Sequence, residues 1–340
     1  MLRRNPIDFF NLIWSDEAVQ KISKNTDLIT RSKIEQNQEN LKPHSRLRKW
    51  SSPSKADIRR LMGIVISMGV IRLPSITDYW SSNNVLCIPF FREVISRDKF
   101  WNLHVADPLP DNVSYPSKSY KIQWLLDHVN MRSQELYEMG QNIAVDETMV
   151  KFKGRIGFRQ YNPKKPTKWG MKLFTLADSN TSYMWQQNLY VGADGRETEL
   201  SKCAQHVLDL VEPLSNLSHT VYADRYFWTL GLAQRLIDSG FNINGTVMPN
   251  RKGFPQRLKS AKHMKPGEII AFRKDDILML QWKDNRVVTM ITNNCRSDEW
   301  CTIKPKNPNH DTRNKPKCIA DYNKHMNGVD VNDQLCTYYL

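Results

Sequence analysis

The sequence has little of what marks several common protein classes. Its six Cys form no CxxC pair, so no zinc site is expected and the thiols are predicted to be reduced. The longest apolar run, Leu61 to Leu73, is interrupted by Ser67 and Arg72 and is too short to cross a bilayer. The first fourteen residues mix Asn, Pro and Asp with apolar residues, which is not typical of a signal peptide. These absences favour a reducing, soluble compartment without a membrane partner.

One long segment also lacks acidic residues. Between Lys151 and Lys172 there is no Asp or Glu, and we call this segment the basic arm. Its cations are Lys151, Lys153, Arg155, Arg159, Lys164, Lys165, Lys168 and Lys172, and its aromatic residues are Phe152, Phe158, Tyr161 and Trp169. Phosphates are bound by Lys and Arg, and unstacked bases pack on aromatic rings. A solvated charged hairpin is the alternative interpretation.

The overall charge supports a polyanionic partner. The formal net charge is +14 at pH 7 and the isoelectric point is about 9.4. Nucleic acid is the commonest partner of so basic a protein, so we predict DNA binding and, with it, a nuclear location.

Hydrophobic periodicity predicts a helical first part. Ser15 and Ser54 each precede an amphipathic pattern and fit helix N-caps. The polar residues 31–55 are expected to form a loop, and residues 120–139 a long helix that packs or dimerises. The chain from 141 onward changes to a strand-like period. The predicted domains are 1–140 (helical dimerisation and DNA-binding region), 141–250 (first part of the core), 251–311 (β-rich insertion) and 312–340 (last helix of the core).

The order of the later elements predicts an α+β fold. Three strands are expected within 142–191, then a helix at 199–213 and a fourth strand at 219–223. This order, with acids on the first and fourth strands, is that of an RNase H-like mixed sheet with flanking helices. Two alternating segments within 276–292 predict a hairpin in the insertion.

Four carboxylates are the candidates for chemistry: Asp146, Asp224, Asp330 and Asp333. Asp146 and Asp224 end predicted strands, while Asp330 and Asp333 share one helix face. Mg²⁺ and Mn²⁺ prefer carboxylate oxygens, and two such ions can promote an in-line phosphoryl displacement. A single Asp is a weak signal, because most acids are caps or surface charges.

Longer motifs carry a family resemblance over nearly the whole chain. The stretches are DETMVKFKGRIGFRQYNPKKPTKWGMK, YADRYFWTLGLAQRLIDSGFNINGTVMPNRKGFP, WKDNRVVTMITN, YNKHMNGVDVNDQLCTYY and, upstream, LMGIVISMGVIRLPSITDYW with SRDKFWNLH. In this order they resemble piggyBac-type transposases.

The resemblance implies a DDE/DDD recombinase with an RNase H-like core. Asp146, Asp224 and Asp330 then correspond to the catalytic triad, and Asp333 to the acid beside it, with two divalent ions (Mg²⁺ or Mn²⁺) as cofactors. The implied reaction cleaves the transposon end, forms a DNA hairpin and joins TTAA target DNA, and a homodimer is expected. Arg159, Lys164, Lys165 and Lys168 would contact DNA phosphates, as would the segment Asn250-Arg251-Lys252.

The chain also departs from the family pattern. It stops at Leu340, whereas the family continues with further helices and a Cys/His-rich zinc module. Trp228 stands where the family tends to have a small hydroxyl residue. We therefore expect a core fragment or a domesticated descendant, which could bind DNA or chromatin without turnover. A glycosidase using paired carboxylates is a third possibility, but neutral glycans do not require the basic arm.

Overall fold

The computed structural model describes residues 5–104, 118–163, 165–192, 200–259, 264–303 and 313–337. The chain divides into two compact units, Met1–Arg132 with Leu335–Leu340, and Ser133–Gln334. Lys164 of the basic arm lies outside the described residues. No described helix has the length and apolar character that a membrane span requires.

The first unit is helical, as predicted. Its α-helices are α1 Pro6–Ile13, α2 Asp16–Gln36, α3 Lys55–Val70, α4 Pro89–Val94 and α5 Arg97–His104, and α6 Tyr120–Leu136 leads into the second unit. Short 3₁₀ turns occupy Gln38–Asn40, Arg46–Lys49 and Ile76–Trp80. The side chains of Ser15 and Ser54 accept hydrogen bonds from the backbone N–H groups of Ala18 and Asp57, which confirms both N-caps.

The predicted loop begins later than expected. Helix α2 continues through residues 31–36, so the loop prediction was wrong there. Asp27 and Arg31 form an ion pair one turn apart, at 3.0 Å, and Thr30 is buried beside them. These contacts extend the helix into a sequence whose polarity suggested a loop.

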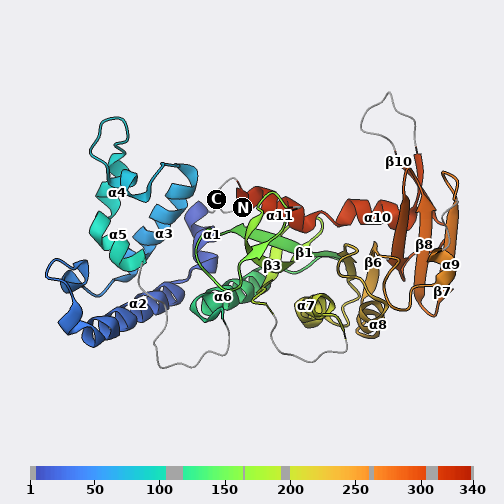
Figure 1. Cartoon of the computed structure of the whole chain (residues 1–340), viewed down its shortest axis with the longest axis horizontal. Helices are drawn as coiled ribbons and strands as arrows, with labels where there is room; N and C mark the ends of the chain where they lie inside the picture. Colours follow the sequence, from blue (N-terminus) through green and yellow to red (C-terminus); the bar gives the residue numbers. More distant parts are fainter. Residues whose placement is uncertain are drawn as a thin grey trace. The chain divides into compact units, whose positions relative to one another are not determined.

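The second unit is built on one mixed sheet, with α-helices α7 Lys202–Val211, α8 Leu230–Asp238, α9 Gln256–Lys259, α10 Lys317–His325 and α11 Gly328–Thr337 (Figure 1). The strands are β1 Asn142–Lys151, β2 Gln160–Tyr161, β3 Trp169–Asp178, β4 Met184–Leu189, β5 Thr220–Ala223, β6 Asn242–Thr246, β7 Ile269–Lys274, β8 Ile277–Lys283, β9 Val287–Thr292, β10 Trp300–Ile303 and β11 Arg313–Pro316. Nine of the described strands form the sheet in the order β2-β3-β1-β5-β6-β9-β8-β7, with β4 paired to β3.

The centre of this sheet has the predicted RNase H-like arrangement. β1 pairs antiparallel with β3, and β3 pairs antiparallel with β4. On its other side β1 pairs parallel with β5, and β5 pairs parallel with β6. The α+β prediction is therefore confirmed in topology as well as in class.

The hairpin predicted in the insertion extends this same sheet. β8 and β9 form the hairpin, and β9 pairs antiparallel with β6 through Asn244 to Thr246. Strands β2, β7, β10 and β11 were not anticipated, because each is short, irregular in polarity or flanked by charge. The domain boundaries at 251 and 311 stay a prediction, although the strands between them join the core sheet.

The two faces of β1 pack against different helices. Ile143 and Val145 belong to a large core with residues of α7 and α8, such as Val207 and Leu236. Ala144, on the opposite face, packs with Val329 of α11. Small residues on that face let α11 lie close to the sheet, and this closeness decides where the acids of α11 are held.

Gly328 is the point of closest approach. A Cβ added there would lie 3.0 Å from the carbonyl oxygen of Asp178 and 3.4 Å from the Cβ of Ala144. The backbone carbonyl cannot move without disturbing the loop that Asp178 holds, because its carboxylate accepts hydrogen bonds from the N–H groups of Gly140 and Thr181. Any side chain at 328 therefore pushes α11 away from the sheet.

We expect Gly328→Ala to lower the free energy of unfolding by about 1–3 kcal/mol, because it overpacks the contact between α11 and β1. Gly63→Ala is the matched control, since nothing lies within 4 Å of an added Cβ in the interior of α3. That control should stabilise the protein by about 0.5–1 kcal/mol through helix propensity. Urea denaturation of both variants measures the difference, and equal effects would contradict the assigned role of Gly328.

Candidate metal centre and nucleic-acid interface

Strand register brings the first two acids together. The parallel pairing of β1 and β5 ends with Val145 opposite Ala223. The next residue on each strand is an acid, Asp146 on one and Asp224 on the other. Asp224 follows the end of β5, whereas Asp146 lies within β1, which continues to Lys151, so the prediction that Asp146 ends its strand was wrong. The parallel register still places the two carboxylates at neighbouring positions.

The loop after β5 fixes the orientation of Asp224. Its carboxylate accepts a hydrogen bond of 2.7 Å from the backbone N–H of Tyr226. Trp228 is fully buried beneath the loop and donates its indole N–H to the carbonyl of Ala223 at 2.8 Å. Gly245 of β6 provides the room, because an added Cβ would lie 1.8 Å from the Trp228 indole nitrogen. The departure at Trp228 is thus accommodated by a glycine on the neighbouring strand.

Helix α11 carries the other two acids to the same face of β1. The hydroxyl of Thr148 donates a hydrogen bond of 2.8 Å to Asp333. Thr148 lies two residues beyond Asp146, so both side chains leave β1 on the side that α11 covers. The hydroxyl of Thr175 on β3 donates to Thr148 at 3.0 Å, which orients the Thr148 hydroxyl toward the helix. Asp330 lies one turn earlier on α11 and is 54% exposed at its side chain.

Lys165 of the basic arm reaches into this acidic group. Its ammonium lies 3.7 Å from the carboxylate of Asp330 and donates a hydrogen bond of 2.9 Å to the backbone carbonyl of Glu147. We call Asp146, Asp224, Asp330, Asp333 and Lys165 the carboxylate cluster. The structure therefore places all four predicted acids within electrostatic reach of Lys165, a cation that was predicted to contact phosphate.

Burial and mutual repulsion govern the ionisation of the cluster. Burial is the main cause that raises the pKa of Asp146 to about 7. The charge of Lys165 and the backbone N–H of Glu147 act to lower this pKa, while the charges of Asp224 and Asp330 contribute to the rise. Burial also raises the pKa of Asp224 and of Asp333. Tyr322 of α10 lies close enough for the same acids to act on it, and burial first, then their charge, raises its pKa to about 12. When its carboxylates are ionised, the cluster therefore carries more negative charge than the neighbouring groups neutralise.

The donor chemistry of the cluster suits a hard divalent cation. Four carboxylates supply only oxygen ligands, which Mg²⁺ and Mn²⁺ prefer. A bound cation would also reduce the repulsion between the ionised carboxylates. As the structure stands, no three Asp, Glu, His or Cys side chains among the described residues converge closely enough to hold a metal ion. The residue types fit divalent metal, and binding requires the carboxylates to turn toward one another.

Glu147 is excluded from the cluster by an ion pair of its own. It pairs with Lys172, and both side chains are largely buried. The Lys172 ammonium also lies 4.6 Å from the ring centroid of Phe174 and 4.8 Å from that of Tyr226. Because these contacts hold Lys172 in the core, we leave it out of the proposed phosphate contacts of the basic arm.

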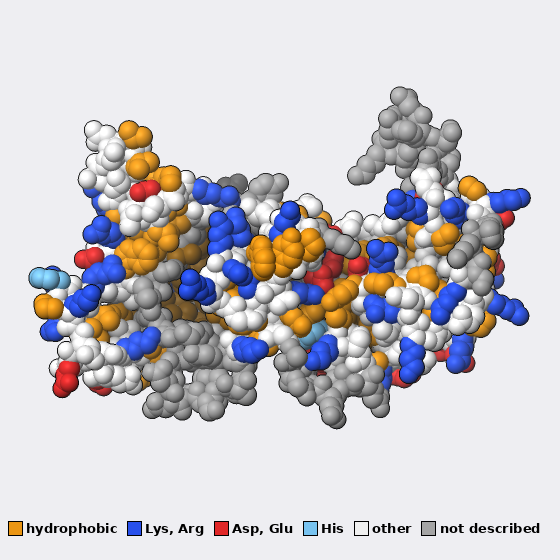
Figure 2. Space-filling model, in the orientation of Figure 1, with side chains coloured by type: hydrophobic (Ala, Val, Ile, Leu, Met, Phe, Trp, Pro, Cys, Tyr) orange, Lys and Arg blue, Asp and Glu red, His pale blue; other side chains and the backbone are white. Residues whose placement is uncertain are grey.

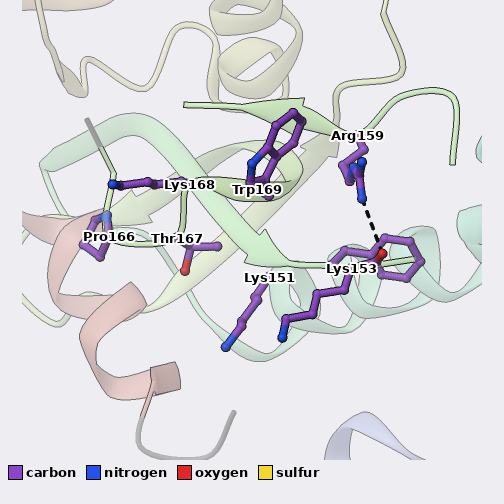
Figure 3. Close-up of a pocket in the computed structure, with 8 residues that line it drawn as sticks. Lys151, Lys153, Arg159, Pro166, Thr167, Lys168 and Trp169 are labelled. Carbon is purple, nitrogen blue, oxygen red and sulfur yellow. Dashed lines mark hydrogen bonds between the residues drawn. The ribbon is translucent and has the colours of Figure 1, made fainter. Parts of the chain in front are cut away.

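The rest of the basic arm surrounds an open pocket of about 480 Å³ (Figure 3). It is lined by Lys151, Phe152, Lys153, Arg159, Pro166, Thr167, Lys168 and Trp169. Arg159 lies over the Trp169 ring, 4.9 Å from its centroid, and donates to the carbonyl of Lys153 at 3.3 Å. The lysines and Trp169 are exposed, which suits contact with a phosphate backbone and with bases. Arg155 is also exposed on the arm.

The second predicted DNA-binding segment, Asn250 to Lys252, contains residues with two different roles. The guanidinium of Arg251 donates to the backbone carbonyls of Arg225 and Tyr226, at 3.1 and 2.6 Å. Arg251 therefore braces the loop that presents Asp224. Lys252 is exposed and remains a candidate for phosphate contact.

Two residues of the site were not found from the sequence. Thr148 could have been recognised by its spacing, because it lies two residues after Asp146 on the same strand face. Tyr322 gave no such signal, since only the packing of α10 brings it near acids distant in the chain.

Asp146→Asn should stabilise the fold at high pH. The folded-state pKa of Asp146, about 7, exceeds the ordinary value of 3.8, so native stability is lost as pH rises from about 4 to 7. The substitution removes that loss, keeps an acceptor for the Glu147 N–H, and should raise the free energy of unfolding by about 2–4 kcal/mol at pH 8. Urea denaturation at pH 4 and pH 8 tests this, and a destabilised variant at pH 8 would contradict it.

Comparisons with known proteins identify relatives of this chain. A family model described as Transposase IS4 matches residues 5–340. The human (Homo sapiens) PiggyBac transposable element-derived protein 3 is 25% identical over 347 residues, which cover 97% of this chain and 56% of that protein. Human PiggyBac transposable element-derived protein 2 is 24% identical over 252 residues, covering 70% of this chain and 42% of that protein. The chain spans about half the length of these curated relatives.

A solved structure shares the fold. The cryo-EM structure of the piggyBac transposase synaptic complex with hairpin DNA matches with a TM-score of 0.81 and 23% sequence identity. The match covers 98% of this chain and 68% of that one. On the family model, the relatives and the shared RNase H-like core, the chain belongs to the piggyBac-type transposase family.

Proposed function

We propose that this chain is the catalytic part of a metal-dependent DNA transposase. The observation that carries the proposal is the cluster itself: the parallel register of β1 and β5 places Asp146 beside Asp224, and α11 holds Asp330 and Asp333 over the same face of β1. Acids so far apart in the sequence meet in a partly buried group at a cost in stability, which is typical of a functional site.

The triad Asp146, Asp224 and Asp330, assisted by Asp333, would hold two divalent ions, Mg²⁺ or Mn²⁺. When bound, such ions activate the attacking oxygen and stabilise the leaving oxygen of a phosphodiester. The Tyr226 N–H orients Asp224, and the hydroxyl of Thr148 orients Asp333. The proposed reaction sequence is strand cleavage at a transposon end, hairpin formation and integration at TTAA.

Double-stranded DNA is the proposed partner, in the nucleus, with the chain acting as a homodimer. Lys151, Lys153, Arg155 and Lys168 of the basic arm are exposed and would contact phosphates beside the cluster. Figure 2 shows Lys and Arg side chains scattered over the visible surface and a small group of acidic side chains near the position of β1. The solved relative, described as a synaptic complex with hairpin DNA, supports this partner.

A second candidate function is DNA or chromatin binding without turnover. It is favoured by Lys165, whose ammonium lies among the acids where a cation would be needed. It is also favoured by the similarity to human proteins described as transposable element-derived. Both functions use the same basic surface, so a cleavage assay separates them.

We expect the chain to cleave nicked or hairpin-ended DNA that carries TTAA when Mg²⁺ or Mn²⁺ is present. Asp224→Asn should slow cleavage by at least about a hundredfold, since loss of a metal ligand removes several kcal/mol of transition-state stabilisation. Asp276→Asn, an exposed acid in the β7–β8 turn, is the matched control and should leave the rate unchanged. Gel analysis of labelled DNA gives the rates. Binding without metal-dependent cleavage would instead support the second function.

DNA affinity should depend steeply on salt because phosphate contacts release counterions. The double substitution Lys151→Ala with Lys168→Ala should reduce the slope of log affinity against log salt by about two. The loss should be similar on unrelated DNA sequences, as expected of phosphate contacts. Lys265→Ala with Lys274→Ala is the matched control: both lysines are exposed, and Lys274 lies on β7 at the opposite edge of the sheet. Fluorescence anisotropy gives both slopes, and equal losses in the two double variants would rule out a specific role for the arm.

A further inference from the structure

Lys165 differs in its contacts from Lys151, Lys153 and Lys168, the exposed lysines of the basic arm. Its side chain is 22% exposed, and its ammonium is held by the carbonyl of Glu147 and the carboxylate of Asp330. Lys168, three residues later, is exposed beside the pocket of Figure 3. One arm residue therefore points to the acids while its neighbour faces solvent.

The backbone around Lys165 presents it to the acids. Pro163 and Pro166 lie two residues before and one residue after it, and each ring fixes its own φ angle. The N–H of Lys165 donates to the carbonyl of Asn162 at 3.4 Å. This hydrogen bond and the two prolines restrain the backbone beside Lys165.

The charge of Lys165 acts on the whole cluster. It lies within electrostatic reach of Asp146, Asp224 and Asp333, in addition to its pair with Asp330. These are the four acids assigned above to divalent cations. An ammonium ion and a divalent cation repel each other strongly at such separations, so they cannot both be stabilised by the same carboxylates.

We propose that Lys165 is an internal counter-ion of the carboxylate cluster, which a divalent cation must displace to bind. The inference rests on the proposed metal-dependent function and adds a mode of regulation to it. Without metal, Lys165 neutralises part of the acidic charge and ties the arm to β1 and α11. Displacement by metal frees the ammonium, and the arm that carries it, to contact a DNA phosphate. Replacement of the Lys165 ammonium by a divalent cation would then both load the site with metal and expose the arm.

The test measures Mn²⁺ affinity directly, by the electron paramagnetic resonance signal of free Mn²⁺ in the absence of DNA. Lys165→Met keeps the length of the side chain and removes its charge, so the dissociation constant should fall by about tenfold. Lys165→Arg keeps the charge and should stay near the wild-type value. Lys168→Met is the matched control, because it removes one charge from the same arm outside the cluster, and it should change affinity by less than about twofold at physiological salt.

Hydrogen exchange gives a second readout. Adding Mn²⁺ to the wild-type protein should speed amide exchange in peptides covering residues 159–170, because the contacts of Lys165 with Glu147 and Asp330 are lost. In Lys165→Met these peptides should exchange quickly with or without Mn²⁺.

The outcomes separate this inference from the proposed function. If the wild-type protein binds Mn²⁺ and Lys165→Met binds it equally or more weakly, the counter-ion role is overturned while the metal-dependent function stands. If the wild-type protein, Lys165→Met and Lys168→Met all fail to bind Mn²⁺, the metal-dependent function is overturned and the inference falls with it.

Discussion

The repulsion among carboxylates gathered on β1, after the end of β5 and on α11 is the constraint on which the site depends. Asp146 and Asp224 are placed side by side by the backbone pairing of β1 and β5, whatever their charges prefer. The fold holds them there through the buried apolar side chains of the core, and Trp228, beneath Asp224, is the largest fully buried side chain among the described residues. A site that opposes the stability of its own scaffold is the usual sign of selection for function.

Compensation for that repulsion comes from two directions. Polar groups of the scaffold, such as the N–H of Tyr226 and the hydroxyl of Thr148, stabilise individual carboxylates. Lys165 supplies positive charge to several of them at once. The first kind of contact is compatible with a bound cation, whereas the second competes with it. Under the proposed function, the cluster would be closed by the arm without metal and open to DNA once a divalent cation is bound.

Small residues, rather than large ones, position the helix that completes the cluster. Gly328, Ala144 and Val329 let α11 approach β1 until Asp333 reaches Thr148. On the neighbouring strand, Gly245 leaves space for Trp228 and so for the loop that presents Asp224. In both places a missing side chain on one element fixes the location of a carboxylate on another. Substitutions far from the acids can thus alter the site through packing alone.

The sequence by itself determined the local elements and the identity of the acids. Periodicity marked the strands around Asp146 and Asp224, Ser15 and Ser54 marked helix starts, and the motifs indicated the family. Tertiary structure alone decided that the β8–β9 hairpin joins the core sheet and that Lys172 is a buried partner of Glu147. It also decided that Lys165 faces the acids and Lys168 the solvent. Local propensity depends on neighbours along the chain, whereas the partner of a charged side chain is set by strand pairing and helix packing between distant segments.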